Sequence, residues 1–119
     1  MDYLVHVKNS IKKYGGEQSD YERIHKFMDS FKTCLADSRH RLFLHNTGGI
    51  NAATIAFGDY IKNSAGKDVS VRDICTDHIL EDLRSIPTVE EIVNHIDKSQ
   101  YALMNSRVLG ELIKYKRKE

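Results

Sequence analysis

The chain has 119 residues, of which 40% are hydrophobic and 29% are charged, and its formal net charge is +1 at pH 7. This length and balance are typical of one soluble globular domain, and a charge near zero creates no global field that would favour nucleic acid or an anionic membrane. No apolar run reaches the ~18 residues of a membrane-spanning helix, and the N-terminal MDYLVHVKNS lacks the apolar segment of a signal peptide. We therefore expect a cytoplasmic protein.

The chain contains two cysteines, Cys34 and Cys75. Two isolated cysteines in a charged chain predict reduced thiols in the core rather than a disulfide framework. A nucleophilic or redox role would need a lowered thiol pKa, and nothing in the residue order indicates one. We therefore interpret both cysteines as structural. The scarcity of proline, which occurs once, favours a helical fold.

Apolar residues at helical spacing predict two helices in the first third of the chain. The first covers residues 2–13 and ends at the two glycines that follow Tyr14. The second should begin near Asp20, because Ser19 and Glu22 have the spacing of a capping box. Its apolar residues recur at intervals of three and four: Ile24, Phe27, Met28, Phe31 and Leu35.

The central stretch, residues 37–49, reads DSRHRLFLHNTGG and precedes a run of small and apolar residues. If residues 39–57 form one helix, one of its faces carries Leu42, Asn46, Ile50, Ala53 and Phe57. Gly48 and Gly49 would each cost this helix about 1 kcal/mol relative to alanine. Such a cost indicates either that another element approaches closely at the glycines or that the glycines break the helix, and both alternatives stay open.

The second half of the chain predicts a turn followed by three more helices. Gly58 ends the preceding helix, and residues 59–71 have the pattern of a short hairpin or an ordered loop. A helix over residues 71–83 is capped by Ser70, Thr88 caps another, and residues 99–114 form the last. The sequence thus predicts a mainly α, single-domain helical bundle of about five helices over residues 1–119, with a short β-hairpin or ordered loop near residues 59–71.

Two polar residues interrupt the apolar face of the predicted helix over residues 71–83. His78 and Asp82 fall among Ile74, Cys75 and Ile79 and, being four residues apart, are neighbours. A buried carboxylate needs a partner, so one interpretation is a structural pair that satisfies itself. The other is a metal site, because an imidazole and a carboxylate at this spacing can present two ligands to one ion.

Further ligands for such an ion would come from other segments. The leading candidates are His40 and His45, in the central stretch. His25 and Asp29 repeat the His-x-x-x-Asp spacing and are weaker candidates, because they lie off the centre of their helix's apolar face, where a solvated position is favoured. His6 and His95 are expected at the surface or its boundary. Glu81 lies beside His78 and Asp82 and is expected to turn toward solvent as an outer partner of this pair.

Arg39 and Arg41 flank His40 and could bind an anion such as phosphate. They could equally form salt bridges with Asp37 and other carboxylates. The sequence leaves both alternatives open.

Four segments, in this order, resemble a family of small uncharacterised proteins of bacteria and tailed phages: KYGGEQSDYERIHKFMDSFK, HRLFLHNTGG, FGDYIKNSAGKDVSVRDICTDHILEDL and IPTVEEIV. The resemblance covers residues 4–97. Its most specific parts are His40-Arg41 with His45-Asn46, the pattern NSxGKxVSVRDI, and HILEDL followed by IPT. The phage type is closest, because bacterial members have His-His where this chain has His45-Asn46. The resemblance implies a small helical intracellular protein of phage origin, with the helix after Asp97 added to the family's core; it implies no activity.

Three functions follow as hypotheses. The first, which requires no catalytic or metal-binding residues, is a soluble accessory protein that binds a protein partner of the host. The alternative is a metal-binding domain or a metal-dependent hydrolase holding a divalent transition metal such as zinc, which would lower the pKa of a bound water for attack on a phosphoryl or acyl group. Nucleic-acid binding through Arg39, Arg41 and the basic tail KYKRKE comes third, because aromatic residues do not alternate with the basic ones.

Overall fold

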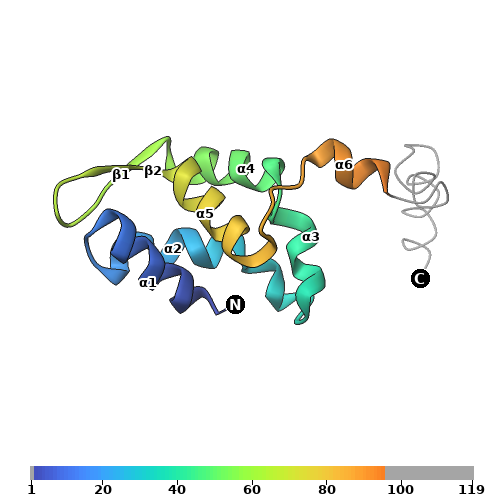
Figure 1. The fold of residues 1–119 in the computed structure, drawn as a ribbon, viewed down its shortest axis with the longest axis horizontal. Helices are drawn as coiled ribbons and strands as arrows, with labels where there is room; N and C mark the ends of the chain where they lie inside the picture. Colours follow the sequence, from blue (N-terminus) through green and yellow to red (C-terminus); the bar gives the residue numbers. More distant parts are fainter. Residues whose placement is uncertain (1, 96–119) are drawn as a thin grey trace, which may run out of the picture. The chain divides into compact units, whose positions relative to one another are not determined.

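The computed structural model describes residues 2–95. These residues contain two short 3-10 helices, Ser30–Thr33 and Ser38–His40, and the following elements: α1 (Tyr3–Tyr14), α2 (Gln18–Met28), α3 (Arg41–Leu44), α4 (Thr47–Phe57), β1 (Tyr60–Lys62), β2 (Asp68–Ser70), α5 (Val71–Leu83) and α6 (Val89–Asn94). The mainly α fold with a short hairpin is confirmed (Figure 1). The chain divides into two units, Met1–Val89 and Glu90–Glu119. The packing described below belongs to the first, and the helix predicted over residues 99–114 lies outside the described residues.

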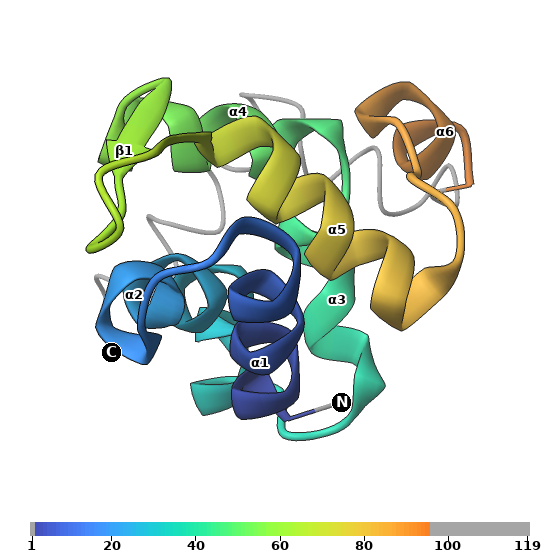
Figure 2. The ribbon, with the colours of Figure 1, turned by 60° about the vertical axis from the view of Figure 1, so that its left-hand side comes forward.

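Helix α5 is the central element of the first unit. It contacts α4 on one side and α1 and α2 on the other, so segments from the whole of this unit meet along it (Figure 2). The apolar core has ten fully buried members: Tyr21, Ile24, Met28, Ile50, Ala53, Val69, Val71, Ile74, Cys75 and Ile79. Five of these residues come from β2 and α5. A polar side chain on the buried face of α5 therefore needs partners from the helices packed against it.

Helices α1 and α2 are joined by two glycines with φ near +81° and +85°, a region that glycine enters at no steric cost. The capping box at the start of α2 is formed by Glu17 and Asp20, so the predicted Ser19–Glu22 box is wrong. A carboxylate accepts the backbone N–H groups at a helix start as well as a hydroxyl does, which lets the helix begin two residues earlier. Helix α2 also ends at Met28, and the predicted face is therefore cut short before Phe31.

The central stretch is divided between two helices at His45 and Asn46. The Asn46 side chain accepts the Gly49 N–H at 3.0 Å and donates to the carbonyls of Leu42 and Phe43, so one amide closes α3 and opens α4. Gly49 has no room for a side chain, because a Cβ there would lie 1.7 Å from the Leu44 carbonyl oxygen. The break precedes the glycines, and the element that approaches Gly49 is the end of α3. The predicted single helix over residues 39–57 is wrong.

The hairpin and α5 match the predicted boundaries. Strands β1 and β2 pair antiparallel with Ile61 opposite Val69, and Ser70 caps α5 by accepting the Asp73 N–H at 3.2 Å. Helix α5 covers residues 71–83, as predicted, and ends at Arg84 in the left-handed conformation with φ 62°. Within the described residues, none of the helices is long and apolar enough to cross a membrane.

The two cysteines have different environments. Cys75 is buried in α5, and burial raises the pKa of its thiol to about 12. Cys34 is exposed just after the first 3-10 helix, so the prediction that it lies in the core is wrong. The reason is that α2 ends early: the chain leaves the core at Asp29 and turns along the surface before it reaches Cys34.

Candidate metal centre

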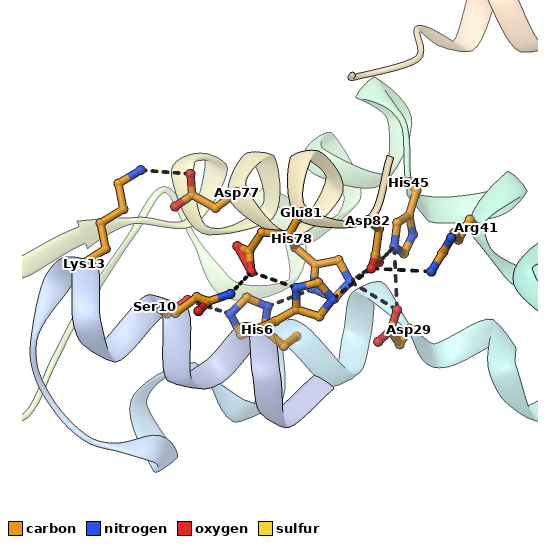
Figure 3. A network of polar contacts seen from close by, with 12 residues as sticks. His6, Ser10, Lys13, Asp29, Arg41, His45, Asp77, His78, Glu81 and Asp82 are labelled. Carbon is orange, nitrogen blue, oxygen red and sulfur yellow. Dashed lines mark hydrogen bonds and ion pairs between the residues drawn. The ribbon is translucent and has the colours of Figure 1, made fainter. Parts of the chain in front are cut away.

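Five of the six histidines are buried, and they gather with two aspartates in the interior of the first unit. Figure 3 shows three of them, His6, His45 and His78, beside Asp29 and Asp82. The cluster, called here the His/Asp centre, consists of His6, His25, Asp29, His40, His45, His78 and Asp82. The prediction that His6 lies at the surface is wrong, as is the solvated position favoured for His25 and Asp29. His95 is exposed, as predicted.

Four residues of the His/Asp centre form its innermost set: Asp29, His45, His78 and Asp82. Each offers one ligand atom, and these atoms all lie within 4.8 Å of one another. His45 Nε2 lies 2.7 Å from Asp82 Oδ2 and 3.6 Å from Asp29 Oδ1. His78 Nε2 lies 3.1 Å from Asp29 Oδ1 and 3.4 Å from Asp82 Oδ2. These separations bracket the distance of about 3.3 Å between neighbouring ligand atoms around a tetrahedral ion with bonds of about 2.0–2.1 Å.

Local structure explains how each of the four side chains reaches this place. His78 and Asp82 lie one turn apart on α5, with side chains directed toward α1 and α2. Asp29 is the C-cap of α2, one turn after His25. His45 is the residue that ends α3, where the break stabilised by Asn46 turns its side chain fully into the interior.

The two carboxylates are held in the ionised form. Burial alone would raise the pKa of Asp29, but the hydrogen bond from His78 and the nearby Lys32 and His45 outweigh it and lower that pKa to about 2. The pKa of Asp82 is likewise lowered, because hydrogen bonds from His45 and His6 outweigh the effect of burial. Both groups therefore carry negative charge at neutral pH inside the fold.

Two of the imidazoles are held in the neutral form. Burial lowers the pKa of His78 to about 4, against the opposing hydrogen bond to Asp29. Burial, followed by the proximity of His78 and His6, lowers the pKa of His25 to about 3. Ionised carboxylates beside neutral imidazoles are the protonation state in which these side chains bind a metal ion.

Behind His78 lies a hydrogen-bonded chain that ends on α1. His78 Nδ1 lies 2.9 Å from His25 Nδ1, and His25 Nε2 lies 2.7 Å from the Ser10 hydroxyl. Only one of the two facing Nδ1 atoms can carry the hydrogen. When His78 carries it, the Nε2 lone pair of His78 is available for an ion and His25 donates its Nε2–H to Ser10. His25 is therefore placed as a partner of a ligand rather than as a ligand, the role that an outer hydrogen-bond acceptor has for metal-bound histidine.

Two further side chains, those of His6 and Arg41, contact Asp82. His6 Nε2 lies 3.3 Å from Asp82 Oδ1, and its ring stacks on that of His78 with centroids 3.7 Å apart. His6 Nδ1 lies 3.1 Å from Glu81 Oε1, which also accepts from Asn9 at 2.6 Å. Glu81 is half-buried, and its carboxylate contacts the centre at His6. Sequence periodicity did not indicate His6.

The structure thus brings together three of the four leading candidates, His45, His78 and Asp82, and adds Asp29 to them. His40 stands beside this set, with its Nε2 3.4 Å from Asp29 Oδ1. The arginines contact carboxylates: Arg39 pairs with Asp37 at 2.9 Å, and Arg41 lies 3.5 Å from Asp82. One signal could have identified Asp29 and His25, because Tyr21, Ile24 and Met28 are the buried residues of α2 and His25 lies within their face.

The fold and the centre define a small, mainly α-helical domain that buries a cluster of histidines and aspartates. The chain belongs to the family described as a domain of unknown function, DUF6915, whose model matches residues 1–102. Neither the curated proteins nor the solved structures contain a match to the chain.

Proposed function

We propose that this domain binds one divalent transition-metal ion through Asp29, His45, His78 and Asp82. The observation that carries the proposal is the convergence of the four ligand atoms within 4.8 Å in the interior. His45 Nε2 and His78 Nε2 each lie near both Asp29 Oδ1 and Asp82 Oδ2. A neutral imidazole has only one ring N–H hydrogen to donate. Two hydrogens can bridge the two shortest contacts, at 2.7 and 3.1 Å, whereas one cation would satisfy all four at once.

The charge of the set supports the same proposal. Two ionised carboxylates with side chains 6% and 1% exposed are costly to bury side by side, and the neutral imidazole of His78 does not compensate their charge. Lys32 and Arg41 contact the outer oxygens, at 3.4 Å from Asp29 Oδ2 and 3.5 Å from Asp82 Oδ1. The inner oxygens, Asp29 Oδ1 and Asp82 Oδ2, face the imidazole nitrogens. A divalent cation placed there would bind the two inner oxygens, which Lys32 and Arg41 do not contact.

The ligand set indicates which kind of ion fits and what it does. Two imidazoles and two carboxylates suit zinc and other first-row divalent metals. Because the ligands come from α2, the end of α3 and α5, a bound ion would join three separate segments and stabilise the fold. A hydrolytic role would need an open coordination position that a substrate can reach, and the four ligand side chains are all 6% exposed or less. Metal binding is therefore the better-supported form of the proposal.

Metal analysis of protein produced without an affinity tag tests this function. We expect about one ion per chain, lost in His78→Ala and Asp29→Ala and retained in His95→Ala, whose side chain is exposed. Substoichiometric metal that His78→Ala leaves unchanged would overturn the proposal. If His78 and Asp82 form only a structural pair, His78→Ala lowers the free energy of unfolding by about 1–3 kcal/mol and leaves the metal content unchanged.

A second candidate function is that of an accessory protein that binds a protein partner in the cytoplasm of a phage host. The resemblance of His45-Asn46 to the phage type supports the origin, and exposed apolar residues support a contact surface: on α3, Leu42 is 55% and Phe43 47% exposed. Leu42→Glu should then abolish capture of a partner from host lysate while His95→Glu does not, and a wild-type chain that retrieves nothing counts against this function. Nucleic-acid binding has less support, because Arg39 and Arg41 contact Asp37 and Asp82.

A further inference from the structure

His40 has a ring orientation that is fixed by the backbone. It is the last residue of the 3-10 helix Ser38–His40, and its Nδ1 lies 2.7 Å from the Asp37 carbonyl oxygen. A carbonyl oxygen can only accept, so the hydrogen of this bond is on Nδ1. The same oxygen also accepts the His40 backbone N–H at 3.2 Å. In a neutral His40, the second ring nitrogen, Nε2, therefore carries a lone pair.

That lone pair faces a carboxylate. His40 Nε2 lies 3.4 Å from Asp29 Oδ1, and the two side chains are 4% and 6% exposed. His40 Nε2 has no hydrogen-bond partner among the described residues. Two acceptors this close in the interior repel each other unless a positive charge lies between them. The ligands proposed above surround that place.

We propose that His40 is a fifth ligand of the metal centre, which would then hold its ion with three imidazoles and two carboxylates. The inference rests on the proposed metal site and specifies its coordination. Asp29 Oδ1 is the atom on which the three imidazoles converge: the Nε2 atoms of His78, His40 and His45 lie 3.1, 3.4 and 3.6 Å from it. His40 stands outside the group of four ligand atoms that lie within 4.8 Å of one another, so its Nε2 would have to approach the ion while Nδ1 keeps its hydrogen bond to the Asp37 carbonyl.

A fifth ligand changes the class of ion that the centre suits. Four donors complete the tetrahedron that zinc prefers in structural sites, and a fifth has no place in it. Three nitrogen and two oxygen donors instead match an ion with five or six ligands, such as Fe(II), Mn(II) or Co(II). In a six-coordinate ion, one position would stay open for a small molecule such as water. The centre would then be more than a structural link between helices.

Cobalt(II) alone is the probe for this inference. In the proton NMR spectrum of the Co(II)-loaded full chain, each metal-bound histidine contributes one strongly shifted, exchangeable ring N–H signal. We expect three such signals in the wild type, two in His40→Ala with cobalt still bound, and three in the control His95→Ala. We also expect the His40→Ala variant to bind Co(II) roughly 10-fold or more weakly than the wild type.

The outcomes separate this inference from the proposed function. Cobalt bound with two shifted signals in the wild type, unchanged in His40→Ala, overturns the fifth ligand and leaves the four-residue site intact; a proton on His40 Nε2 would give this result. A wild-type chain that binds no cobalt overturns both. The wild-type spectrum decides even if His40→Ala fails to fold.

Discussion

The His/Asp centre is built from two regions that place their side chains in different ways. In α5, His78 and Asp82 occupy successive turns of a regular 13-residue helix. In the irregular segment before α4, His40 ends a 3-10 helix and His45 ends α3, and an asparagine and a glycine hold the break between α3 and α4. A regular helix needs only correct spacing to present two ligands, whereas an irregular segment needs dedicated side-chain and backbone contacts for each one.

The strongest disruption should come from the α5 side. Asp82→Ala removes the carboxylate that faces His6, His45 and His78, and it leaves Arg41 without this buried partner. We expect loss of bound metal and a decrease of about 3–5 kcal/mol in the free energy of unfolding, measured by urea titration. Asp68→Ala, at an exposed position of β2, is the control and should change neither. Metal retained at the wild-type level in Asp82→Ala would exclude Asp82 as a ligand.

Disruption of the irregular segment should have a slightly smaller effect. In Gly49→Ala, the new Cβ would meet the Leu44 carbonyl oxygen at 1.7 Å, so the end of α3 has to shift and His45 shifts with it. We expect about 3 kcal/mol of destabilisation together with weaker metal binding. Ile55→Ala is the control, because this side chain is 78% exposed on α4 and its truncation leaves the break untouched. Equal metal affinity in both variants would show that the break does not position His45.

The pH dependence of the metal-free protein tests the contact between α2 and α5. The folded-state pKa values of His25 and His78, about 3 and about 4, lie below the usual 6.5, so the unfolded chain binds protons first as the pH falls. The two neutral histidines therefore contribute to the free energy of unfolding above pH 6.5, and this contribution is lost as the pH falls through 5 toward 4. The loss is about 2 kcal/mol per histidine between pH 7 and 5. Asp29 adds a further loss as the pH falls from its usual 3.8 toward 2.

Urea titrations in the presence of a chelator at pH 7, 6 and 5 measure this loss. His95→Gln should follow the wild-type curve, because that histidine is exposed. A midpoint that stays constant from pH 7 to 5 would contradict the neutral state of the buried pair.

The last prediction concerns the rates at which the two cysteines react with a thiol reagent, and it involves no change in stability. A thiol reagent should modify the exposed Cys34 within minutes and leave Cys75 unmodified, because Cys75 is buried in α5 with a pKa near 12. In Cys34→Ser, the rate at which Cys75 reacts then reports how often α5 opens. Metal should slow that rate if the centre joins α5 to α2 and α3. Fast modification of Cys75 in the folded protein would show that α5 is less protected than its burial indicates.

The regular elements were predictable and the irregular ones were not. The bounds of α5 and the position of the hairpin followed from capping residues and from the periodicity of apolar residues. His78 and Asp82 stood out because they interrupt an apolar face. His25 and Asp29 were misplaced because the face of α2 was extended through Phe31 and Leu35, although the helix ends at Met28. Without Phe31 and Leu35, the buried face of α2 is centred beside His25.

The amino-acid sequence by itself determined the helices that rely on local interactions: the lengths of α1 and α5, the cap at Ser70 and the pair of polar residues one turn apart on α5. The tertiary structure decided that His6, Asp29 and His45 contact that pair and that His40 lies beside them at Asp29. These residues lie in segments whose ends are fixed by contacts between distant atoms, such as the Leu44 carbonyl against Gly49. Local periodicity cannot indicate them, because the partners that make their burial favourable come from other helices.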